Sequence, residues 1–397
     1  MAQVAVLARK CNGCGKCVVS CPFGGIDMVD GKPVLNAGCR VCGICLKACP
    51  SKAMIRLETK VESVDKSKWK DILVYAEVSG GKLHPVSLEL IGKAHELRQG
   101  TDYVVKAVAL GENIGDCAEE LRHYGVAEVY TYDDEELSYF RADAFAACVE
   151  DCIEQMKPSV VLVGATALGR SLAPRLSTRF HTGLTADCTR LELRENSDLV
   201  QIRPAFGGNI MAQIVTPYTR PQFATVRYKV MDAPVRAQRA QGEIIRRPIP
   251  RAAMLSPTRH VSSQPVPKAT NISDADILVV GGRGLRKEAD LEMVKELAGL
   301  LGGEYAVTRP LVEKGWATNL RQIGLSGRTV RPKLIITCGV SGAIQFTASM
   351  DASERIIAIN EDKDAPIFQV AHIGIVGDLY EVLPGLLETL GKEATVV

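Results

Sequence analysis

The chain has 397 residues, and its 48 Lys and Arg nearly balance its 46 Asp and Glu, leaving a formal net charge of +2. This balance gives no reason to expect nucleic acid or an anionic membrane as a partner. No uninterrupted run of about 18 apolar residues occurs, and none precedes the first cysteine. We therefore expect no signal peptide and no membrane span, a cytoplasmic location, and two or three domains.

Thirteen cysteines in a chain expected in a reducing compartment indicate metal or redox chemistry rather than disulfides. Eight of them lie before residue 50. The remaining five are scattered through helical and strand patterns, and we interpret them as small buried apolar residues without a chemical role: Cys117, Cys148, Cys152, Cys188 and Cys338.

The first 62 residues contain two copies of the pattern C-x2-C-x2-C-x3-C-P, which is the spacing of a bacterial two-cluster ferredoxin. Three closely spaced thiolates hold three corners of a [4Fe-4S] cluster, and the fourth cysteine of each copy reaches the other cluster. One predicted ligand set is therefore Cys11, Cys14, Cys17 and Cys49, and the other is Cys39, Cys42, Cys45 and Cys21. Two structural zinc sites are the alternative, but zinc explains neither the third cysteine nor the proline. This domain, 1–62, is predicted to relay electrons.

Residues 66–242 alternate short apolar runs with helical periods, which predicts a doubly wound α/β domain with a parallel sheet. The expected strands are 72–78, 103–111, 128–134 and 160–166, and the expected helices are 87–97, 116–125 and 143–158. A loop, a helix and a strand follow over 164–193, and 200–234 reads as a β-rich end to the domain.

Residues 243–270 contain five prolines and no apolar period, so we predict an extended, hinge-like linker there. The α/β pattern then resumes over 271–397, which predicts a smaller Rossmann-like domain. Its expected strands lie near 276–281, 305–310, 334–339 and 356–360, and its expected helices near 288–302 and 377–391.

The stretch CGVSGAIQ, residues 338–345, places a glycine-containing turn between an apolar strand and a helix. Free amides of Ser341, Gly342, Ala343 and Ile344 at a positive helix end suit a pyrophosphate. An ordinary strand-to-helix turn has the same appearance, so this motif alone leaves both interpretations open.

Several segments together resemble the alpha subunits of electron-transfer flavoproteins. They are VVGGRGL (279–285), YAVTRPLVEKGW (305–316), RQIGLSG (321–327), PKLIITCGVSGAIQF (332–346) and IIAINEDKDAPIFQVAHIGIVGDL (356–379), with GATALGRSLAPRLSTRFHTGLTADCT (164–189) and RPAFGGNIMAQI (203–214) in the first α/β domain. The resemblance runs from about residue 65 to the end of the chain. With a ferredoxin module in front of these domains, the chain resembles the electron-bifurcating subset of alpha subunits found in anaerobes, as in caffeyl-CoA reductase or lactate dehydrogenase complexes.

The resemblance implies an FAD site in the last domain. Arg283 and the turn Ser341, Gly342, Ala343, Ile344 and Gln345 match positions that hold the diphosphate and ribityl chain, whereas Asn360, Asp378 and Leu379 match the adenosine half. Thr308 and Arg309 match a pair beside the isoalloxazine, where a guanidinium stabilises negative charge on the ring. Gln322, Ile323 and Ser326 match the loop along the N5 and C4 edge.

Three positions depart from the family pattern. Leu325 and Ser326 stand where a Gln and a Thr are usual, and Phe346 stands where a histidine is usual. The serine retains a hydroxyl, but the phenylalanine removes a hydrogen-bond donor expected at the C2 oxygen of the flavin. We therefore expect FAD to bind with altered redox tuning.

Two functions fit these features. In the first, the chain is the FAD-bearing alpha subunit of a bifurcating flavoprotein that, with a beta subunit, couples NADH oxidation to reduction of soluble ferredoxin and of an acyl-CoA dehydrogenase-like or other dehydrogenase partner, such as an enoyl-CoA reductase. In the second, the chain is a non-bifurcating carrier that relays single electrons between a dehydrogenase and ferredoxin. The sequence contains no Ser-His-Asp arrangement or carboxylate pair that indicates hydrolysis.

Overall fold

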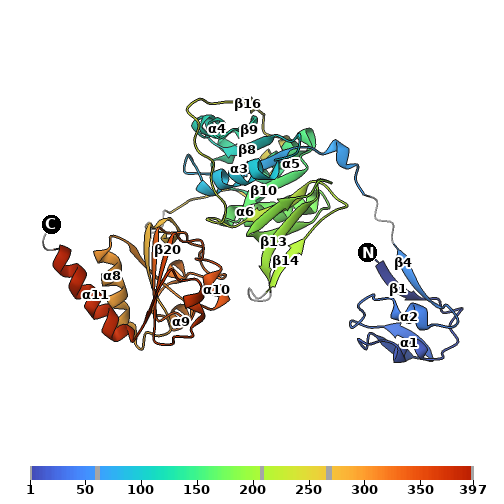
Figure 1. Cartoon of the computed structure of the whole chain (residues 1–397). Coiled ribbons are helices and arrows are strands. Elements are labelled where there is room, and N and C mark those ends of the chain that lie inside the picture. The colour runs from blue at the N-terminus through green and yellow to red at the C-terminus, as the bar shows by residue number, and fades with distance from the viewer. Residues whose placement is uncertain (1, 59–62, 206–209, 265–270, 395–397) are drawn as a thin grey trace. The chain divides into compact units, whose positions relative to one another are not determined.

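The computed structural model describes residues 2–58, 63–205, 210–264 and 271–394. The chain divides into two compact units, Met1–Val64 and Asp65–Val397 (Figure 1). Residues 59–62 and 265–270, at predicted domain boundaries, and residues 206–209 of the RPAFGGNIMAQI motif lie outside the described residues. Each unit is described separately below.

The N-terminal unit is built from two similar halves. Strand β1 (Ala2–Val6) pairs antiparallel with β4 (Met54–Glu58), and β2 (Ile26–Val29) pairs with β3 (Lys32–Leu35). Between the strands lie two short helices, α1 (Lys16–Val19) and α2 (Ile44–Ala48). Their buried cysteines pack with Val4, Ile26 and Met54 in a small core. A core of this size is small even for a short domain, which is consistent with a fold held together by a bound group.

The larger unit contains the predicted parallel sheet. Among the described residues its strand order is β11-β15-β10-β5-β8-β9-β16, and every neighbouring pair is parallel. The strands are β5 (Ile72–Ala76), β8 (Val105–Gly111), β9 (Glu128–Asp133), β10 (Val160–Gly164), β11 (Leu184–Cys188), β15 (Gln222–Val226) and β16 (Glu243–Arg246). Their near-continuous apolar sequences follow from burial on both faces of the sheet.

Four helices cover this sheet. Helices α3 (Pro85–Leu97) and α4 (Gly115–Arg122) contribute to the core on one face, and α5 (Ala142–Met156) and α6 (Ala167–Arg179) contribute to the core on the other face. The alternation of strands and helices predicted over 72–166 is confirmed. All five scattered cysteines are buried, as expected, and burial raises the pKa of Cys148 and Cys188 to about 12.

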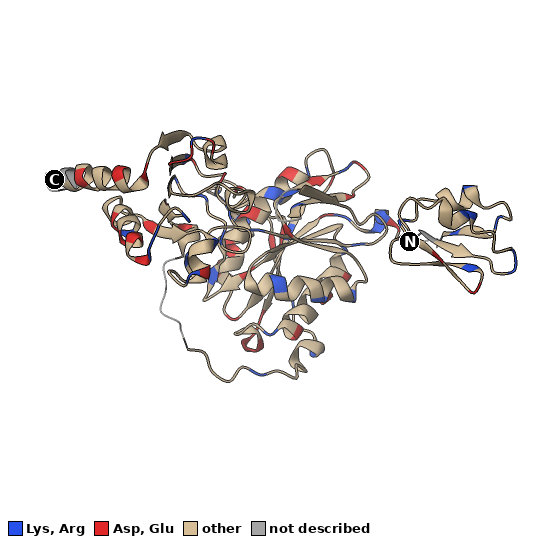
Figure 2. Ribbon diagram, turned by 90° about the horizontal axis from the view of Figure 1, so that it is seen from below, with Lys and Arg blue, Asp and Glu red and all other residues tan. Residues whose placement is uncertain are grey.

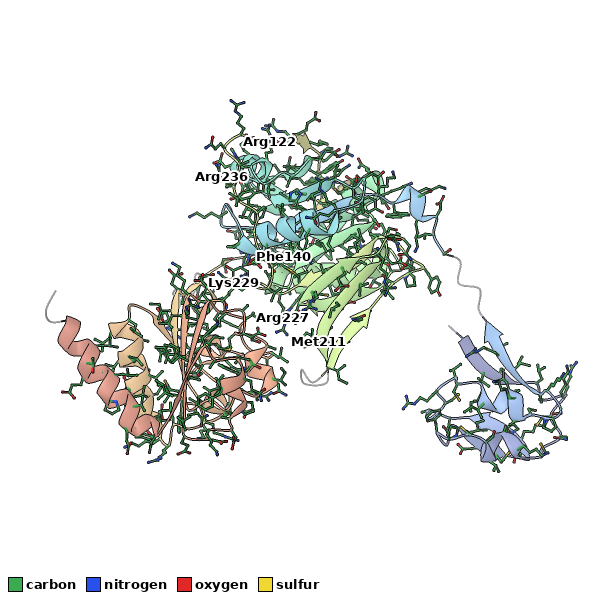
Figure 3. The ribbon with its side chains drawn as sticks, viewed as in Figure 1. Arg122, Phe140, Met211, Arg227, Lys229 and Arg236 are labelled. Atoms are coloured by element: carbon green, nitrogen blue, oxygen red, sulfur yellow. The ribbon has the colours of Figure 1, made fainter. Side chains whose placement is uncertain are left out.

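The β-rich end of this domain forms a second, antiparallel sheet of β12 (Arg190–Leu193), β13 (Leu199–Ala205) and β14 (Ile210–Ile214). Its last strand exposes about half of the side chains of Ile210 and Met211, the latter labelled in Figure 3. A small hairpin of β6 (Val78–Ser79) and β7 (Lys82–Leu83) follows β5.

The linker prediction for 243–270 is wrong over its first part. Residues 243–246 form β16, which pairs in parallel with β9 at the sheet edge. Helix α7 (Arg251–Met254) packs on α5, and Ile249 and Ala253 are buried in the core of the first α/β domain. Pro248 and Pro250 lie between β16 and α7, where proline interrupts neither a strand ladder nor a helix, so proline content alone overestimated the linker.

The last domain has a five-stranded parallel sheet in the order β18-β17-β19-β20-β21. Its strands are β17 (Ile277–Gly281), β18 (Glu304–Val307), β19 (Leu334–Cys338), β20 (Arg355–Asn360) and β21 (Ile373–Val376). Helices α8 (Leu291–Leu300) and α11 (Leu379–Ala394) pack side by side on one face (Figure 1), while α10 (Ile344–Thr347) lies over the core on the other face. This is the smaller Rossmann-like domain that the sequence predicts.

Helices in the described ranges are all too short or too polar to cross a membrane. Figure 2 shows that acidic and basic residues are interspersed over the larger unit, whereas Lys and Arg predominate in the N-terminal unit.

A buried ion pair near the start of the larger unit ties the antiparallel sheet to the parallel sheet. Arg220, whose side chain is fully buried, lies 2.9 Å from Asp198, and Lys66 binds the same carboxylate at 2.7 Å. Burial would raise the pKa of Asp198, but the hydrogen bonds from Lys66 and Arg220 outweigh it and hold the pKa below its usual value. The carboxylate therefore stays charged and doubly paired.

We predict that Arg220→Ala lowers the free energy of unfolding by about 3–5 kcal/mol, because the change leaves a buried carboxylate without its main partner. Lys66→Ala is the matched control. Since Lys66 is partly solvent-exposed, its loss should cost no more than about 1 kcal/mol. Urea unfolding of both variants measures the difference, and equal losses would contradict the importance of burial.

Candidate functional site

The eight N-terminal cysteines line two separate cavities. The first is lined by Cys11, Cys14, Cys17 and Cys49, and the second by Cys39, Cys42, Cys45 and Cys21. In each cavity three cysteines come from one motif and the fourth from the other motif. The fold thus brings together the two sets that the spacing predicts, including the exchange of the fourth cysteine.

Local backbone geometry explains how each motif forms its half of a cavity. Gly15 and Gly43 precede the two short helices with φ values of 69° and 81°, a left-handed conformation that glycine adopts without strain. Cys17 and Cys45 follow on the first helical turn and are buried. At each fourth cysteine the backbone amide four residues further along the chain donates to the thiol, from Gly25 to Cys21 and from Ala53 to Cys49, both at 3.3 Å.

These cavities suit a cluster rather than a single ion. In the described part of the chain, no three His, Cys, Asp or Glu side chains converge closely enough to hold one metal ion. A four-iron cube binds each thiolate at a different corner, so its ligands need not meet at a point. Burial raises the pKa of Cys17 and Cys45, so loading such a group must displace their protons.

A third cavity, of about 650 Å³, lies within the last domain. Its walls come from the loops after β17, β18 and β19, at the carboxyl ends of three neighbouring parallel strands. Strand β17 lies between β18 and β19, so the connection from β17 to β18 and the connection from β18 to β19 run across the sheet in opposite directions. Such a topological switch point is where open α/β sheets bind their ligands. The volume is in the range of small-molecule and cofactor pockets.

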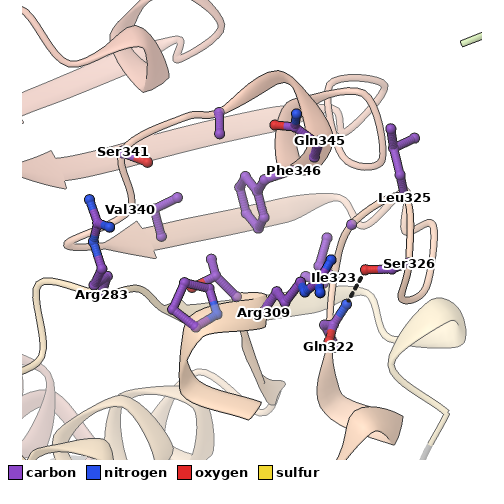
Figure 4. Close-up of a pocket in the computed structure, with 14 residues that line it drawn as sticks. Arg283, Arg309, Gln322, Ile323, Leu325, Ser326, Val340, Ser341, Gln345 and Phe346 are labelled. Carbon is purple, nitrogen blue, oxygen red and sulfur yellow. Dashed lines mark hydrogen bonds between the residues drawn. The ribbon is translucent and has the colours of Figure 1, made fainter. Parts of the chain in front are cut away.

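Polar groups lie at both ends of this cavity, with apolar side chains between them (Figure 4). Arg283 and Ser341 lie at one end, and Gln322 and Ser326 at the other, joined by a hydrogen bond of 2.9 Å from Gln322 Nε2 to Ser326 Oγ. Phe346 lies in the middle of the view. The arrangement suits an elongated ligand with a charged segment and a flat, partly apolar segment.

Thr308, which lines the cavity, has an unusual hydrogen-bonding state. It occupies the residue before α9 (Arg309–Glu313), a position where threonine usually caps a helix through its hydroxyl, but here the hydroxyl makes no capping bond. Its Oγ1 is buried and has no hydrogen-bond partner in the structure. Buried hydroxyls are normally satisfied, so this unpartnered hydroxyl, on a residue that lines the cavity, agrees with the predicted contact of Thr308 with a cofactor.

Arg309 lines the cavity but is 65% exposed, and its Nε donates to Glu313 Oε1 at 2.7 Å. The two residues are one helical turn apart, so the contact needs no rearrangement of the backbone. The guanidinium therefore lies at the mouth of the cavity, and part of its charge is balanced by Glu313.

Nine of the fourteen residues predicted for the cofactor line this cavity: Arg283, Thr308, Arg309, Gln322, Ile323, Ser326, Ser341, Ala343 and Gln345. The other five do not. Ile344 is exposed on α10, and Leu379 is buried in the core beside α8. Gly342, at φ 81°, serves the turn, because an added Cβ would lie 2.1 Å from the amide of Ile367.

The remaining two residues support loops. Asn360 donates from Nδ2 to the carbonyl of Val340 at 2.8 Å, and so holds the turn after β19. Asp378 accepts from the amide of Tyr380 at 2.8 Å and lies 3.3 Å from Arg286. Their predicted contacts with the adenosine half of FAD stay predictions. Helix α10 has only four residues, so the expected positive helix end is weaker than a full helix would give.

Sequence reasoning missed five residues on the wall: Pro310, Gly324, Leu325, Val340 and Phe346. All five adjoin predicted residues, and apolar walls between polar contacts are typical of ligand pockets, so their position was the available signal. Leu325 and Phe346 are two of the family departures noted above. Both face the cavity, where they make its surface more apolar.

Comparisons with known proteins agree with this geometry. The chain matches the 4Fe-4S dicluster domain over residues 10–54, the electron transfer flavoprotein domain over 72–252 and the electron transfer flavoprotein FAD-binding domain over 271–351. The fold and sites therefore define a flavoprotein subunit of electron transfer with an added iron-sulfur domain.

Three relatives carry the assignment further. The chain is 51% identical to lactate dehydrogenase (NAD(+),ferredoxin) subunit LctC of Acetobacterium woodii, over 92% of this chain and 88% of that protein. It is 43% identical to the electron transfer flavoprotein subunit alpha of Thermoanaerobacterium thermosaccharolyticum, over 82% and 98% of the two chains, and 42% identical to that of Megasphaera elsdenii, over 83% and 99%. The chain belongs to the electron transfer flavoprotein alpha-subunit family.

We predict that Thr308→Val weakens FAD binding about tenfold and leaves the stability of the FAD-free protein unchanged or raised. The valine removes a donor that the ligand uses and an unsatisfied buried hydroxyl that the free protein bears. Fluorescence titration with FAD and thermal unfolding of the apoprotein measure the two effects. If affinity is unchanged, the hydroxyl does not face the cofactor.

We also predict that Arg309→Ala retains FAD but lowers its reduction potential, because a cation beside the ring is lost. Glu313→Gln should raise the potential, since it removes the carboxylate that balances Arg309. Redox titration of both variants provides the measurement, with Arg309→Lys as the charge-preserving control. Shifts of the same sign in the alanine and glutamine variants would contradict this role.

Proposed function

We propose that the chain is the FAD- and iron-sulfur-containing alpha subunit of an electron-bifurcating electron-transfer flavoprotein. The observation that carries the proposal is that one polypeptide combines two four-cysteine cavities with a ligand cavity at the switch point of a family FAD-binding domain. Iron-sulfur clusters exchange single electrons, and a flavin exchanges one or two. The proposed subunit would therefore combine both kinds of electron carrier in one chain.

The two cysteine sets would hold two [4Fe-4S] clusters, and the third cavity would hold FAD. Arg283 and the amides of the turn at Ser341 would bind the diphosphate and ribityl chain, because they lie together at one end of the cavity. Thr308, Arg309, Gln322 and Ser326 would orient the ring. When bound, these cofactors supply the redox chemistry, and the protein's side chains set their position and environment.

The proposed partners are a beta subunit, a dehydrogenase and soluble ferredoxin. The beta subunit would carry the flavin at which NADH is oxidised, and a dehydrogenase would complete the reaction with its own substrate. The name of the relative at 51% identity states lactate dehydrogenase, NAD(+) and ferredoxin, which favours a 2-hydroxy acid dehydrogenase as partner. An acyl-CoA dehydrogenase-like enzyme, such as an enoyl-CoA reductase, is the alternative partner.

The coupling balances over two turnovers. Two NADH release four electrons; two reduce ferredoxin through the cysteine-rich unit, and two reach the dehydrogenase through the FAD-binding domain and reduce one substrate molecule. In the reverse direction, two electrons from one reduced substrate molecule and two electrons from reduced ferredoxin together reduce two NAD(+). The cysteine-rich unit is proposed to serve the ferredoxin branch, because it is a compact unit of its own and the FAD-binding domain belongs to the other unit.

The second candidate function, a carrier without bifurcation, uses the same cofactors but needs no pyridine nucleotide. The decisive experiment is to purify the complex anaerobically with its partners and to follow NADH oxidation with ferredoxin and the dehydrogenase's acceptor singly and together. Bifurcation requires both acceptors at once. Ferredoxin reduction by NADH without the second acceptor would contradict bifurcation, and no NADH oxidation under any condition would favour the carrier.

We predict about eight irons and one FAD per chain after anaerobic preparation, from two four-iron clusters and one flavin site. Deleting residues 1–62 should remove all of the iron and abolish ferredoxin reduction, yet leave FAD content unchanged, because the FAD cavity is formed entirely by residues of the last domain. Metal and flavin analyses of both proteins test this. Zinc in place of iron, or ferredoxin reduction at the full rate by the truncated complex, would contradict it.

A further inference from the structure

The two cysteine cavities have different rims, although the motifs that form them are identical in spacing. The repeat relates Asn12 to Arg40 and Gly13 to Val41, each pair directly after the first cysteine of a motif. The residue after each Cys-Pro pair is exchanged along with the fourth cysteine. Ser51 therefore lines the first cavity, and Phe23 lines the second.

Polar or small residues form the first rim at these positions. Asn12 is exposed, and the Ser51 hydroxyl lies 3.5 Å from Cys49 Sγ. At the second rim the corresponding residues are a cation and large apolar side chains. Phe23 is 52% exposed and Ile44 is 43% exposed, and both line the second cavity together with Arg40. Large apolar groups exposed next to a redox centre indicate a surface that a partner covers.

The backbone at the second rim is held in a strained conformation. Val41 has φ 55°, a left-handed value that is rare for a β-branched residue, whereas its counterpart Gly13 adopts φ 69° without strain. Arg56 Nη2 donates to the Val41 carbonyl at 3.0 Å and so helps to fix the loop. Strain of this kind persists where the surrounding structure enforces it, commonly at functional sites. Arg40, the preceding residue, is thereby presented from a fixed loop.

The charged residues in and next to the two cysteine motifs are all basic. Over residues 9–23 and 39–52 there are six basic residues and no acidic residue: Arg9, Lys10, Lys16, Arg40, Lys47 and Lys52. All six are exposed, and none forms an ion pair within the described residues. The acidic residues Asp27 and Asp30 lie on β2 and in the turn that follows it, outside both motifs. A surface of this kind attracts acidic proteins and raises their rate of encounter.

We propose that the rim of the second cavity, formed by Arg40, Phe23 and Ile44, is the docking face for a small acidic iron-sulfur protein, and that electrons leave or enter through the group held by Cys21, Cys39, Cys42 and Cys45. The inference rests on the proposed function for the identity of the reaction. It adds which of the two cavities faces the partner and which chemistry recognises the partner. An apolar contact of Phe23 and Ile44 beside the cation Arg40 would meet an acidic surface.

The test uses the complete complex and an acidic two-cluster ferredoxin as the probe. Ferredoxin reduced photochemically is mixed with the oxidised complex, and the second-order rate of electron transfer is followed by stopped flow at about 20 mM and about 500 mM salt, where screening is weak and strong. Binding of fluorescently labelled ferredoxin is measured by anisotropy in parallel. Neither readout needs NADH.

We expect Arg40→Asn, which installs the residue of the first rim, to lower the rate roughly threefold to tenfold at low salt and little at high salt. Phe23→Ser, the corresponding apolar change, should weaken binding at both salt concentrations, because apolar contacts are not screened. Arg40→Lys should retain most of the rate. Lys32→Asn is the matched control, since it removes the same charge from the exposed β3 strand and lines neither cavity.

Equal effects of Arg40→Asn and Lys32→Asn would overturn the proposal, because net charge alone would then explain the rates. A larger effect of Lys10→Asn, beside Cys11, would move the docking face to the first cavity and overturn it as well. If Arg40→Asn and Phe23→Ser leave the anisotropy unchanged but slow NADH-driven turnover, the rim contacts another part of the complex, and the proposal is overturned. Iron content of each variant confirms that its cavities are loaded. Failure of the unmodified complex to couple NADH to ferredoxin would refute the proposed function while leaving these readouts valid.

Discussion

The order of five parallel strands in the last domain is the constraint on which its ligand site depends. Because β17 lies between β18 and β19, the loops that leave these strands separate and open a space at their carboxyl ends. Arg283, Thr308 and Ser341 follow the three strands within a few residues and therefore meet around one cavity. The rest of the site refines this arrangement. The Leu325 amide donates to the Gln345 carbonyl at 2.8 Å, which joins two of the loops.

The N-terminal unit follows a different constraint, in which a short chain must form two cysteine-lined cavities with very little core. Exchange of the fourth cysteine solves this problem, because each half of the unit then depends on the other half for a complete cavity. The exchange also permits the two halves to diverge. Phe23 belongs to the first motif but shapes the second cavity, so identical spacing coexists with different surroundings. Such surroundings, through solvent access and hydrogen bonds to sulfur, set the behaviour of an iron-sulfur group.

The departures from the family pattern acquire a physical meaning in the last domain. Phe346 is 5% exposed, packs into the core beside α10 and also forms part of the cavity wall. A histidine there would bring a polar group to the same place, so the phenylalanine exchanges a hydrogen bond to the ligand for apolar contact. Arg283 and Arg309 are the two cations among the residues that line the cavity, and Glu313 moderates the charge of Arg309.

Spacing and period in the sequence determined the two cysteine sets and the succession of strands and helices, because these features depend on neighbours along the chain. The resemblance to a known family, rather than spacing or period, supplied the nine predicted residues that line the ligand cavity. The tertiary structure decided what depends on distant neighbours. It placed β16 beside β9 at the sheet edge and α7 against α5, although two prolines lie between these elements. It left Thr308 without a partner and set Asn360 to brace Val340, and it brought Phe23 to the second cysteine cavity. Local pattern carries no information on such contacts, because they arise only when segments far apart in sequence are packed together.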